Sequence, residues 1–266
     1  MLTSRASSLL VLVAAVAAGC GARSELPVCE RGESRPCESV CGTGVQLCVQ
    51  GQWEPCNAQL PETVVALPTT VRDFRIDHPD FESEVIGLDL GMVEDTLGAD
   101  GKPVYAGAPT TPTTTGQASF DQWFRDVAGV NQSTTFTVEL AATAADPSVY
   151  SFDSAEFFPI DGQLFGNEGN PHNFHFTLEM QVSFRYAGGE VFTFRGDDDV
   201  FAFINGHLAI DLGGVHSAEL RTVDLDAEAE ALGIVPGEIY PLALFFAERH
   251  TSGSSFHVET TISEIA

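Results

Sequence analysis

Residues 191–214, VFTFRGDDDVFAFINGHLAIDLGG, decide the fold of this 266-residue chain. Their two apolar runs are separated by Asn205-Gly206, a dipeptide that favours a two-residue hairpin turn because it tolerates the positive φ angles of that turn. The stretch therefore predicts a pair of antiparallel strands. Four carboxylates lie at the open end of this hairpin and are the candidate ligands of a metal ion: Asp197, Asp198, Asp199 and Asp211.

The turn sets the expected register of the hairpin. Val200 should face Asp211, so that Asp198 and Asp211 share one face and lie roughly 7–8 Å apart at Cα. Four acids at one end of a hairpin repel one another unless solvent screens them or a cation neutralises them. Ca²⁺ suits such an all-oxygen site. A solvated acidic turn is the alternative interpretation.

The neighbours Asp197 and Asp198 would point to opposite faces of a regular strand. For both to bind one ion, the backbone has to leave strand geometry. A cis peptide bond between them would achieve this at a cost of about 3–4 kcal/mol, which a bound divalent cation could offset.

The composition is that of a strongly acidic globular protein. Twelve basic residues stand against 38 acidic ones, a formal charge of −26. This balance disfavours nucleic acid and anionic membrane surfaces as partners and suits a secreted surface. The chain contains no nucleophile elbow, HExxH motif or phosphate loop. We expect no enzyme, although Glu248 with Asp197 and Asp198 offers paired carboxylates of the kind used in glycoside hydrolysis.

Residues 1–20 have the pattern of a lipoprotein signal peptide. A basic residue, Arg5, precedes the apolar run Leu9–Ala18, which is too short to span a bilayer. Ala17-Ala18-Gly19-Cys20 resembles a bacterial lipobox, with Cys20 as the lipidated residue, and ordinary signal cleavage is the alternative. We expect an exported protein that is anchored to the outer membrane or cell surface and contacts the membrane only through its lipid.

Residues 21–60 form a short cysteine-rich module. A segment this short in an exported protein is expected to be stabilised by disulfides, with a zinc site as the less favoured alternative. The sequence leaves the connectivity open. If Cys20 carries lipid, the odd number predicts a thiol that stays free or bonds to a disulfide-linked partner, and if it does not, six cysteines could form three bridges. The cysteines are Cys29, Cys37, Cys41, Cys48 and Cys56.

Residues 61–69 read as a linker, and residues 70–266 as one domain made mostly of strands. Alternating apolar residues predict long strands, above all over 174–186, where one face is apolar and the other more hydrated. Aromatic residues at helical spacing predict a helix over 119–129 whose apolar stripe packs in the core. A shorter helix is expected over 224–233. These patterns predict an all-β antiparallel sandwich with one or two short helices.

Three motifs carry a family resemblance: GDDDVFAFING at 196–206, DLGGVH at 211–216 and FFAERHTSGSSFHVETTI at 245–262. Together they resemble the fibro-slime domain of secreted microbial proteins, from about Thr70 to the C-terminus. That domain is related to the protective-antigen-type, jelly-roll-like β-sandwich, which fungal flocculins use as a calcium-dependent sugar-binding head. The segments CGTGVQLC and GQWEPC resemble cysteine-rich stalk modules of bacterial surface proteins.

The resemblance implies a site. In lectins of this type a pair of aspartates binds Ca²⁺, the ion coordinates sugar hydroxyls, and a later loop completes the site. Asp197-Asp198 matches the pair, and residues 248–255 match the loop. In these lectins a small residue usually follows the aspartate pair, whereas this chain has Asp199 at that position. The loop also lacks the asparagine and tryptophan of the flocculin loop. The candidate ligand-binding residues of this loop are Arg249, His250, Ser252 and Ser255.

The expected function is surface binding or adhesion, in which the head recognises carbohydrate or a matrix polymer with the help of Ca²⁺. The alternative is a structural component of an extracellular matrix that assembles through protein contacts without sugar. In that interpretation Arg249 forms an ion pair with one of the aspartates and stabilises the loop without any ligand.

Overall fold

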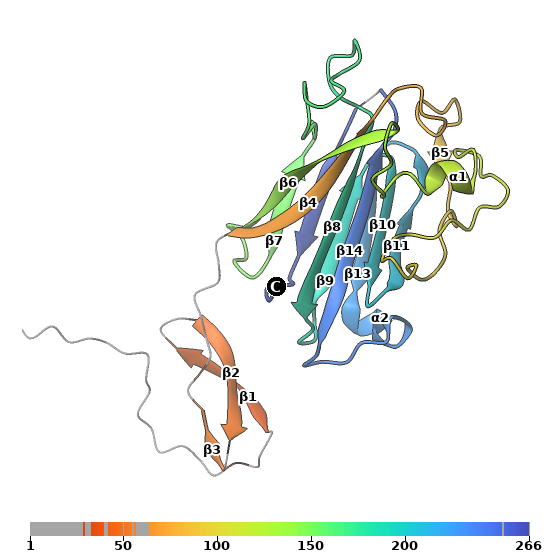
Figure 1. Ribbon diagram of the computed structural model, residues 1–266. Coiled ribbons are helices and arrows are strands. Elements are labelled where there is room, and N and C mark those ends of the chain that lie inside the picture. The colour runs from red at the N-terminus through yellow and green to blue at the C-terminus, as the bar shows by residue number, and fades with distance from the viewer. Residues whose placement is uncertain are drawn as a thin grey trace, which may run out of the picture. The chain divides into compact units, whose positions relative to one another are not determined.

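The computed structural model describes residues 29, 33–39, 42–49, 51–54, 56, 64–251 and 253–265. The chain divides into two compact units, Met1–Pro61 and Glu62–Ala266. In the described residues both units are built mainly from antiparallel strands (Figure 1). This confirms the predicted fold class.

The N-terminal unit is a three-stranded sheet of β1 (Ser34–Ser39), β2 (Gly42–Val49) and β3 (Gln52–Trp53). Two disulfides, Cys29–Cys48 and Cys37–Cys56, each close a loop with a sequence separation of 19 residues. A disulfide across a loop of this size stabilises a fold by about 3 kcal/mol. The expected disulfides are thus confirmed for four of the five cysteines, and Cys41 lies outside the described residues.

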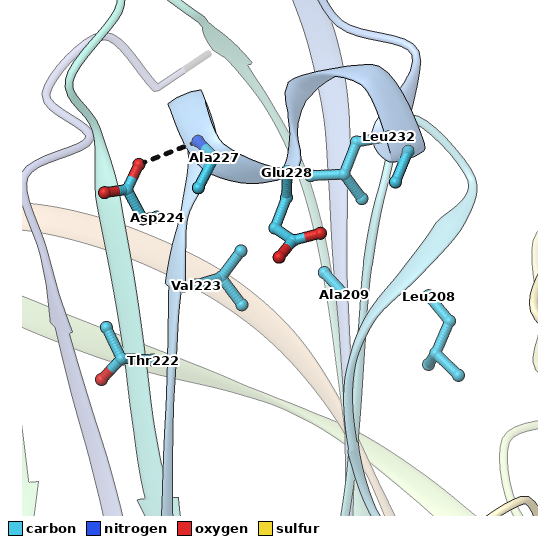
Figure 2. Close-up of a pocket in the computed structure, with 9 residues that line it drawn as sticks. Leu208, Ala209, Thr222, Val223, Asp224, Ala227, Glu228 and Leu232 are labelled. Atoms are coloured by element: carbon cyan, nitrogen blue, oxygen red, sulfur yellow. Dashed lines mark hydrogen bonds between the residues drawn. The ribbon is translucent and has the colours of Figure 1, made fainter.

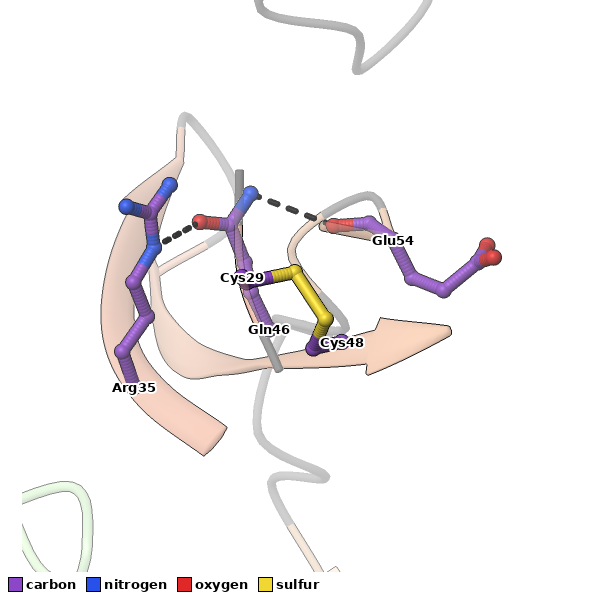
Figure 3. Close-up of a disulfide and its surroundings, with 5 residues drawn as sticks. All are labelled: Cys29, Arg35, Gln46, Cys48 and Glu54. Carbon is purple, nitrogen blue, oxygen red and sulfur yellow. Dashed lines mark hydrogen bonds between the residues drawn. A yellow bond between two sulfur atoms is a disulfide. The ribbon is translucent and has the colours of Figure 1, made fainter. Parts of the chain in front are cut away.

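A small core beside one disulfide holds this module together. Trp53 is buried, and the guanidinium of Arg35 lies 4.3 Å from the centre of its ring. Arg35 also donates a 2.9 Å hydrogen bond to Gln46, whose amide donates in turn to the backbone oxygen of Glu54 (Figure 3). The disulfides take the place of the large apolar core that so short a segment cannot form.

The large unit contains one ten-stranded antiparallel sheet in the order β11-β10-β14-β8-β4-β6-β7-β15-β9-β13. The sheet curls until its two edge strands, β11 and β13, approach each other, so that it encloses its core as a nearly closed sandwich. Its strands are β4 (Val64–Phe74), β6 (Asn131–Ala142), β7 (Tyr150–Ser154), β8 (Phe176–Arg185), β9 (Val191–Gly196), β10 (Asp199–Ile204), β11 (His207–Leu212), β13 (Glu219–Asp224), β14 (Ile239–Glu248) and β15 (Phe256–Thr260).

Two apolar cores lie on the two faces of this sheet. Inside it, Phe194, Phe246 and Phe256 pack together with aliphatic side chains from most of the strands. On the outer face, residues 87–130 fold over β10 and β14 and bury Phe201 and Phe245. The aromatic stripe expected in the core is part of this second cluster: Phe120, Trp123 and Phe124 are at most 1% exposed.

The aromatic residues of this second cluster are buried without the long helix that their spacing predicted. Within residues 117–130 only α1 (Gln117–Phe120) is helical, so the prediction of a helix over 119–129 is wrong. The side-chain amide of Asn131 donates to the backbone oxygens of Gln122 and Arg125, at 3.1 and 2.9 Å. These bonds satisfy carbonyls that helix formation would otherwise have paired. By contrast, α2 (Leu225–Leu232) forms as predicted over 224–233, capped by Asp224 and Gly233.

Two other expectations change. Residues Val64 to Thr69, expected in the linker, form the first half of β4 and pair with β6, so the link between the units is shorter. The polar face of 174–186, predicted to be more hydrated, is covered in its first half and exposed at Gln181 and Arg185. Thr177 is fully buried and donates a 2.6 Å hydrogen bond to the backbone oxygen of Trp123. Alternating polar and apolar residues predict that a strand has two different faces. They do not indicate whether a segment distant in the sequence covers the polar face.

Candidate functional site

The hairpin at the centre of the site is β10–β11, with Asn205 at φ 52° and Gly206 at φ 78° in its turn. Ile204 pairs with His207 as predicted, but a β-bulge follows between Ala202 and Phe203. Ala209 is the additional residue, because Phe203 pairs with Leu208 and Ala202 with Ile210. The bulge moves the rest of β11 by one position relative to the expected register.

This shift separates two of the predicted acids. Asp211 pairs with Phe201, not with Val200, and so belongs to the outer face of the sheet. Its carboxylate accepts hydrogen bonds from the backbone N–H groups of Gly91 (2.8 Å) and Gly213 (3.1 Å). The predicted pairing of Asp211 with Asp198 on one face is therefore wrong, since an extra residue in one strand reverses which face each later side chain occupies.

Asp199 forms a buried ion pair with Arg249 at the junction of β10 and β14. Both side chains are 0% exposed, and the guanidinium donates from Nε to Oδ2 at 2.5 Å and from Nη2 to Oδ1 at 3.0 Å. Its Nη1 donates to the backbone oxygens of Asp80 (2.8 Å) and Thr113 (2.9 Å). All three nitrogens of the guanidinium thus donate hydrogen bonds within the protein. This is the arrangement expected in the alternative interpretation, in which Arg249 pairs with an aspartate and no ligand is bound.

Arg249 also joins this site to the outer core. The guanidinium carbon lies 4.5 Å from the centre of the Trp123 ring. Trp123 donates in turn to the carboxylate of Asp80 at 3.0 Å. Gly214, in the short strand β12 (Gly214–Val215) that pairs with β5 (Gly87–Leu88), donates to Asp199 at 2.7 Å. One ion pair therefore connects the hairpin with three other segments of the chain.

Asp198 adopts a left-handed backbone conformation, with φ 55°. Aspartate tolerates this region better than most residues. Its peptide bond to Asp197 is not cis, because the cis bond found in the described residues is Ala108–Pro109. The left-handed conformation of Asp198, and not a cis bond, thus provides the departure from strand geometry that two neighbouring ligands of one ion require.

The Asp198 carboxylate is buried and accepts two backbone hydrogen bonds. Arg249 N–H donates to Oδ2 at 2.8 Å, and His216 N–H donates to Oδ1 at 3.2 Å. Burial raises the pKa of Asp198 to about 8; the guanidinium of Arg249 opposes this shift, and the charge of Asp199 adds to it. Asp198 therefore resists ionisation at neutral pH unless another positive charge comes close.

Asp197 lies at the surface of the same cluster. It is partly exposed, and its Oδ1 accepts a hydrogen bond from the backbone N–H of Ser255. The loop of residues 249–255 is thus tied to both aspartates of the pair, through Arg249 N–H at Asp198 and through Ser255 N–H at Asp197. The loop and the aspartate pair predicted from the motifs lie together.

Glu248, expected in the loop and grouped with Asp197 and Asp198 as a paired carboxylate, lies in this cluster as the last residue of β14. It continues the inward-facing series of β14 after Leu244 and Phe246, and this strand alternation was the signal for its burial, which was not predicted. The side chain is buried, and its Oε2 has no hydrogen-bond partner. Burial, with the charges of Asp198 and Asp197, raises the pKa of Glu248 well above its ordinary value.

Two hydroxyls lie beside this cluster. The Oγ atom of Ser255 is buried without a hydrogen-bond partner, whereas the Ser254 side chain interacts with the Glu248 carboxylate and lowers its pKa, against the larger effect of burial. A buried polar atom left unpaired costs about 1–3 kcal/mol, so Glu248 Oε2 and Ser255 Oγ indicate a place where a further polar group or ion can bind. The pairing of Ser254 and Glu156 in a parallel bridge fixes the loop there.

The remaining predicted loop residues lie at different depths. His250 is partly exposed, and its Nε2 lies 3.9 Å from Glu82 Oε2. Thr251 donates to the same oxygen at 3.2 Å. Ser252 lies outside the described residues. Within the described part of the chain, no three His, Cys, Asp or Glu side chains are arranged so that they could hold a metal ion.

The fold and the two disulfides define an exported, all-β protein, since disulfides persist in oxidising compartments. Residues 141–264, which include the aspartate pair and the loop, match the family model described as "PA14 domain". No helix in the described residues is long and apolar enough to cross a membrane. The predicted lipidation site, Cys20, lies outside these residues.

Curated relatives come from Dictyostelium discoideum. Protein psiR is 40% identical over 201 residues, which cover 70% of this chain and 20% of the relative. Protein psiD is 40% identical over 219 residues, which cover 76% of this chain and 42% of the relative. The chain thus spans less than half the length of either protein.

Among solved structures, similarity is distant. The A domain of epithelial adhesin 9 from Candida glabrata, in complex with Galb1-4GlcNAc, is 15% identical, with a TM-score of 0.33 over 77% of this chain and 87% of that one. A "PA14 sugar-binding domain from RTX adhesin" is 15% identical, with a TM-score of 0.26 over 34% of this chain and 47% of that one.

Proposed function

We propose that the unit of residues 62–266 is the head of an extracellular binding protein that recognises carbohydrate or a carbohydrate-containing matrix polymer, with Ca²⁺ beside Asp197 and Asp198. The observation that supports this most is the uncompensated cluster of acids. Asp197, Asp198 and Glu248 lie together, while the guanidinium of the neighbouring Arg249 is paired with Asp199.

The donor atoms suit calcium in kind. Carboxylate and hydroxyl oxygens are hard ligands, and Ca²⁺ accepts six to eight of them in flexible geometry. Asp197 and Asp198 supply carboxylates, and the hydroxyls of Ser254 and Ser255 lie in the neighbouring loop. Glu248 adds a carboxylate oxygen that no other group satisfies. Because these acids are not arranged as a ready metal site, we propose that calcium entry turns the side chain of Glu248 or Asp198 toward the ion.

A bound Ca²⁺ would neutralise the acids and offer open coordination positions to vicinal hydroxyl groups of a sugar. This chain's own contribution is the rigid frame. The Arg249–Asp199 pair and the two backbone N–H groups on Asp198 hold the aspartate pair and the loop against each other. Preorganised groups of this kind lower the cost of binding a ligand. The proposed role is binding without catalysis, and the proposed anchor is a lipid on Cys20.

A structural role in an extracellular matrix is the second candidate. One observation favours it: the Arg249–Asp199 ion pair is complete without any ligand, as the alternative interpretation requires. In that case the head would join its partners through protein contacts, and the cysteine left over by the two disulfides would form an intermolecular bond.

The two candidates differ in one binding experiment. The full chain is immobilised and exposed to a glycan array with 1 mM Ca²⁺ or with EDTA. Retention of defined glycans that EDTA removes, and that the Asp197→Asn/Asp198→Asn variant lacks, is the result that the carbohydrate proposal predicts. Disulfide-linked oligomers that form equally with and without calcium and sugar would favour the structural role.

A further inference from the structure

A pocket of about 260 Å³ lies far along the hairpin from the acidic cluster, where β11 and β13 meet α2. Figure 2 shows its walls: β11 with Leu208 and Ala209 on one side, β13 with Val223 on the other, and α2 above. Most drug-sized ligands occupy pockets of roughly 300–1,000 Å³. This pocket is therefore of the size that takes a single long side chain.

The pocket lies beside the bulge in β11. Ala209 is the residue that has no partner on β10, and a bulged strand bends away from its neighbour. As β11 and β13 are the two edges of the curled sheet, no strand fills the space between them. The pocket thus lies between the two edge strands, beside the bulged residue, with α2 at one end.

The helix that covers the pocket is fixed in place. Asp224 caps its first turn by accepting from the backbone N–H groups of Asp226 and Ala227. Tyr186 donates to the Asp226 carboxylate at 2.6 Å, and Asn205 donates to the Leu232 carbonyl at 3.0 Å. These hydrogen bonds at both ends, with Leu225 and Leu232 buried in the core, fix the position of α2 beside the pocket.

The lining combines an apolar floor with a free negative charge. Leu208, Ala209, Val223 and Leu232 supply carbon atoms, while Glu228 reaches from α2 into the space between the two strands (Figure 2). Within the described residues, no hydrogen bond or ion pair engages the Glu228 carboxylate. One oxygen of Asp224, at the rim, accepts the capping bonds and the other is free to accept more.

We propose that this pocket receives a lysine side chain from a basic segment of a partner protein. The four methylenes of lysine match the floor formed by Val223 and the leucines, and the ammonium group matches Glu228 and Asp224. No arginine or lysine lines the pocket, and α2 carries only acidic charged residues. Charge complementarity therefore selects a cation, and the apolar floor selects one on an aliphatic stem. This site is independent of the proposed sugar site.

The test is an NMR titration of the ¹⁵N-labelled full chain with acetyl-Gly-Ala-Lys-Ala-Gly-amide. The expected result is a saturable change in the amide signals of Ala209, Val223 and Ala227. The same peptide with norleucine in place of lysine should bind at least about five-fold more weakly, as the ammonium is then missing. Absence of site-localised changes at millimolar peptide, or equal binding of the norleucine peptide, would overturn the proposal.

Three variants distinguish binding of the peptide in this pocket from its non-specific attraction to the acidic chain. Glu228→Gln should weaken binding about five-fold, whereas Glu230→Gln, on the same helix but outside the pocket lining, should change it less than about two-fold. Ala231→Phe should block the pocket without changing the charge. Equal losses in the two glutamate variants would reduce the site to non-specific attraction and contradict the proposal. Thermal melts confirm that each variant is folded, and the glutamate pair alone decides the outcome if Ala231→Phe is not.

Discussion

Asp199 and Arg249 lie 50 residues apart in the sequence and form an ion pair that is fully buried, with two hydrogen bonds of 2.5 and 3.0 Å. The pair joins the hairpin to the loop that follows β14. Through Arg249 it also reaches the backbone of Asp80 and Thr113. The arrangement of the acidic cluster therefore depends on an interaction that involves no ligand.

Replacing one partner of this pair should destabilise the large unit strongly. We expect Arg249→Met to lower the free energy of unfolding by about 3–5 kcal/mol, because it leaves the Asp199 carboxylate buried and unpaired. Urea denaturation followed by far-UV circular dichroism measures the change. Arg195→Met is the matched control, since Arg195 is 37% exposed where it pairs with Asp153 and should matter by at most about 1 kcal/mol. Similar losses in both variants would refute a special role for the buried pair.

The stability of the large unit should fall with rising pH because of Asp73. This side chain is fully buried at the end of β4, and burial raises its pKa from 3.8 to about 6. Since the folded pKa is the higher one, the contribution of Asp73 is fully present below pH 4 and is lost as the pH rises through about 6. This shift in pKa corresponds to a loss of about 3 kcal/mol in the free energy of unfolding.

Asp73→Asn isolates this effect. Its unfolding free energy should depend less on pH between 4 and 6.5 than that of the unaltered chain, whereas Asp95→Asn, at an exposed position, should leave the dependence unchanged. Urea titrations at half-unit pH intervals provide the comparison. Identical pH profiles for the Asp73→Asn variant and the unaltered chain would show that Asp73 is not the group that titrates.

Reduction of the disulfides should unfold the N-terminal unit and leave the large unit folded. Each unit contains one of the two tryptophans of the chain, Trp53 and Trp123, and both are buried. Dithiothreitol should shift the emission of a Trp123→Phe variant, which reports on Trp53, to longer wavelength. The emission of a Trp53→Phe variant should stay unchanged, as no cysteine occurs after Cys56. A red shift of Trp123 on reduction would contradict this independence.

Local signals in the sequence predicted the elements that local interactions determine. The Asn205-Gly206 turn and the caps of α2, Asp224 and Gly233, were readable because their backbone angles and hydrogen bonds involve near neighbours. The position of Asp211 was not readable, since the bulge at Ala209 changes the register and carries no clear mark in the sequence.

Long-range packing accounts for the other differences. The aromatic spacing at 119–129 indicated a buried stripe but not its backbone, which Asn131 holds in a non-helical form. Within the candidate site, the motifs brought together Asp197, Asp198 and the loop, and the ion pair of Arg249 was foreseen as the alternative. The burial of Glu248 beside them depends on the closing of the sandwich, which no single segment encodes.

The measurement that tests the central proposal most directly is a calorimetric titration of the full chain with Ca²⁺ at pH 7.5. We expect saturable binding that is lost in Asp197→Asn/Asp198→Asn and weakened in Glu248→Gln. Binding should be unchanged in Asp211→Asn, because that carboxylate is hydrogen-bonded to Gly91 and Gly213 on the other face of the sheet. No heat of binding at millimolar Ca²⁺, or binding that survives the loss of both aspartates, would contradict the proposal.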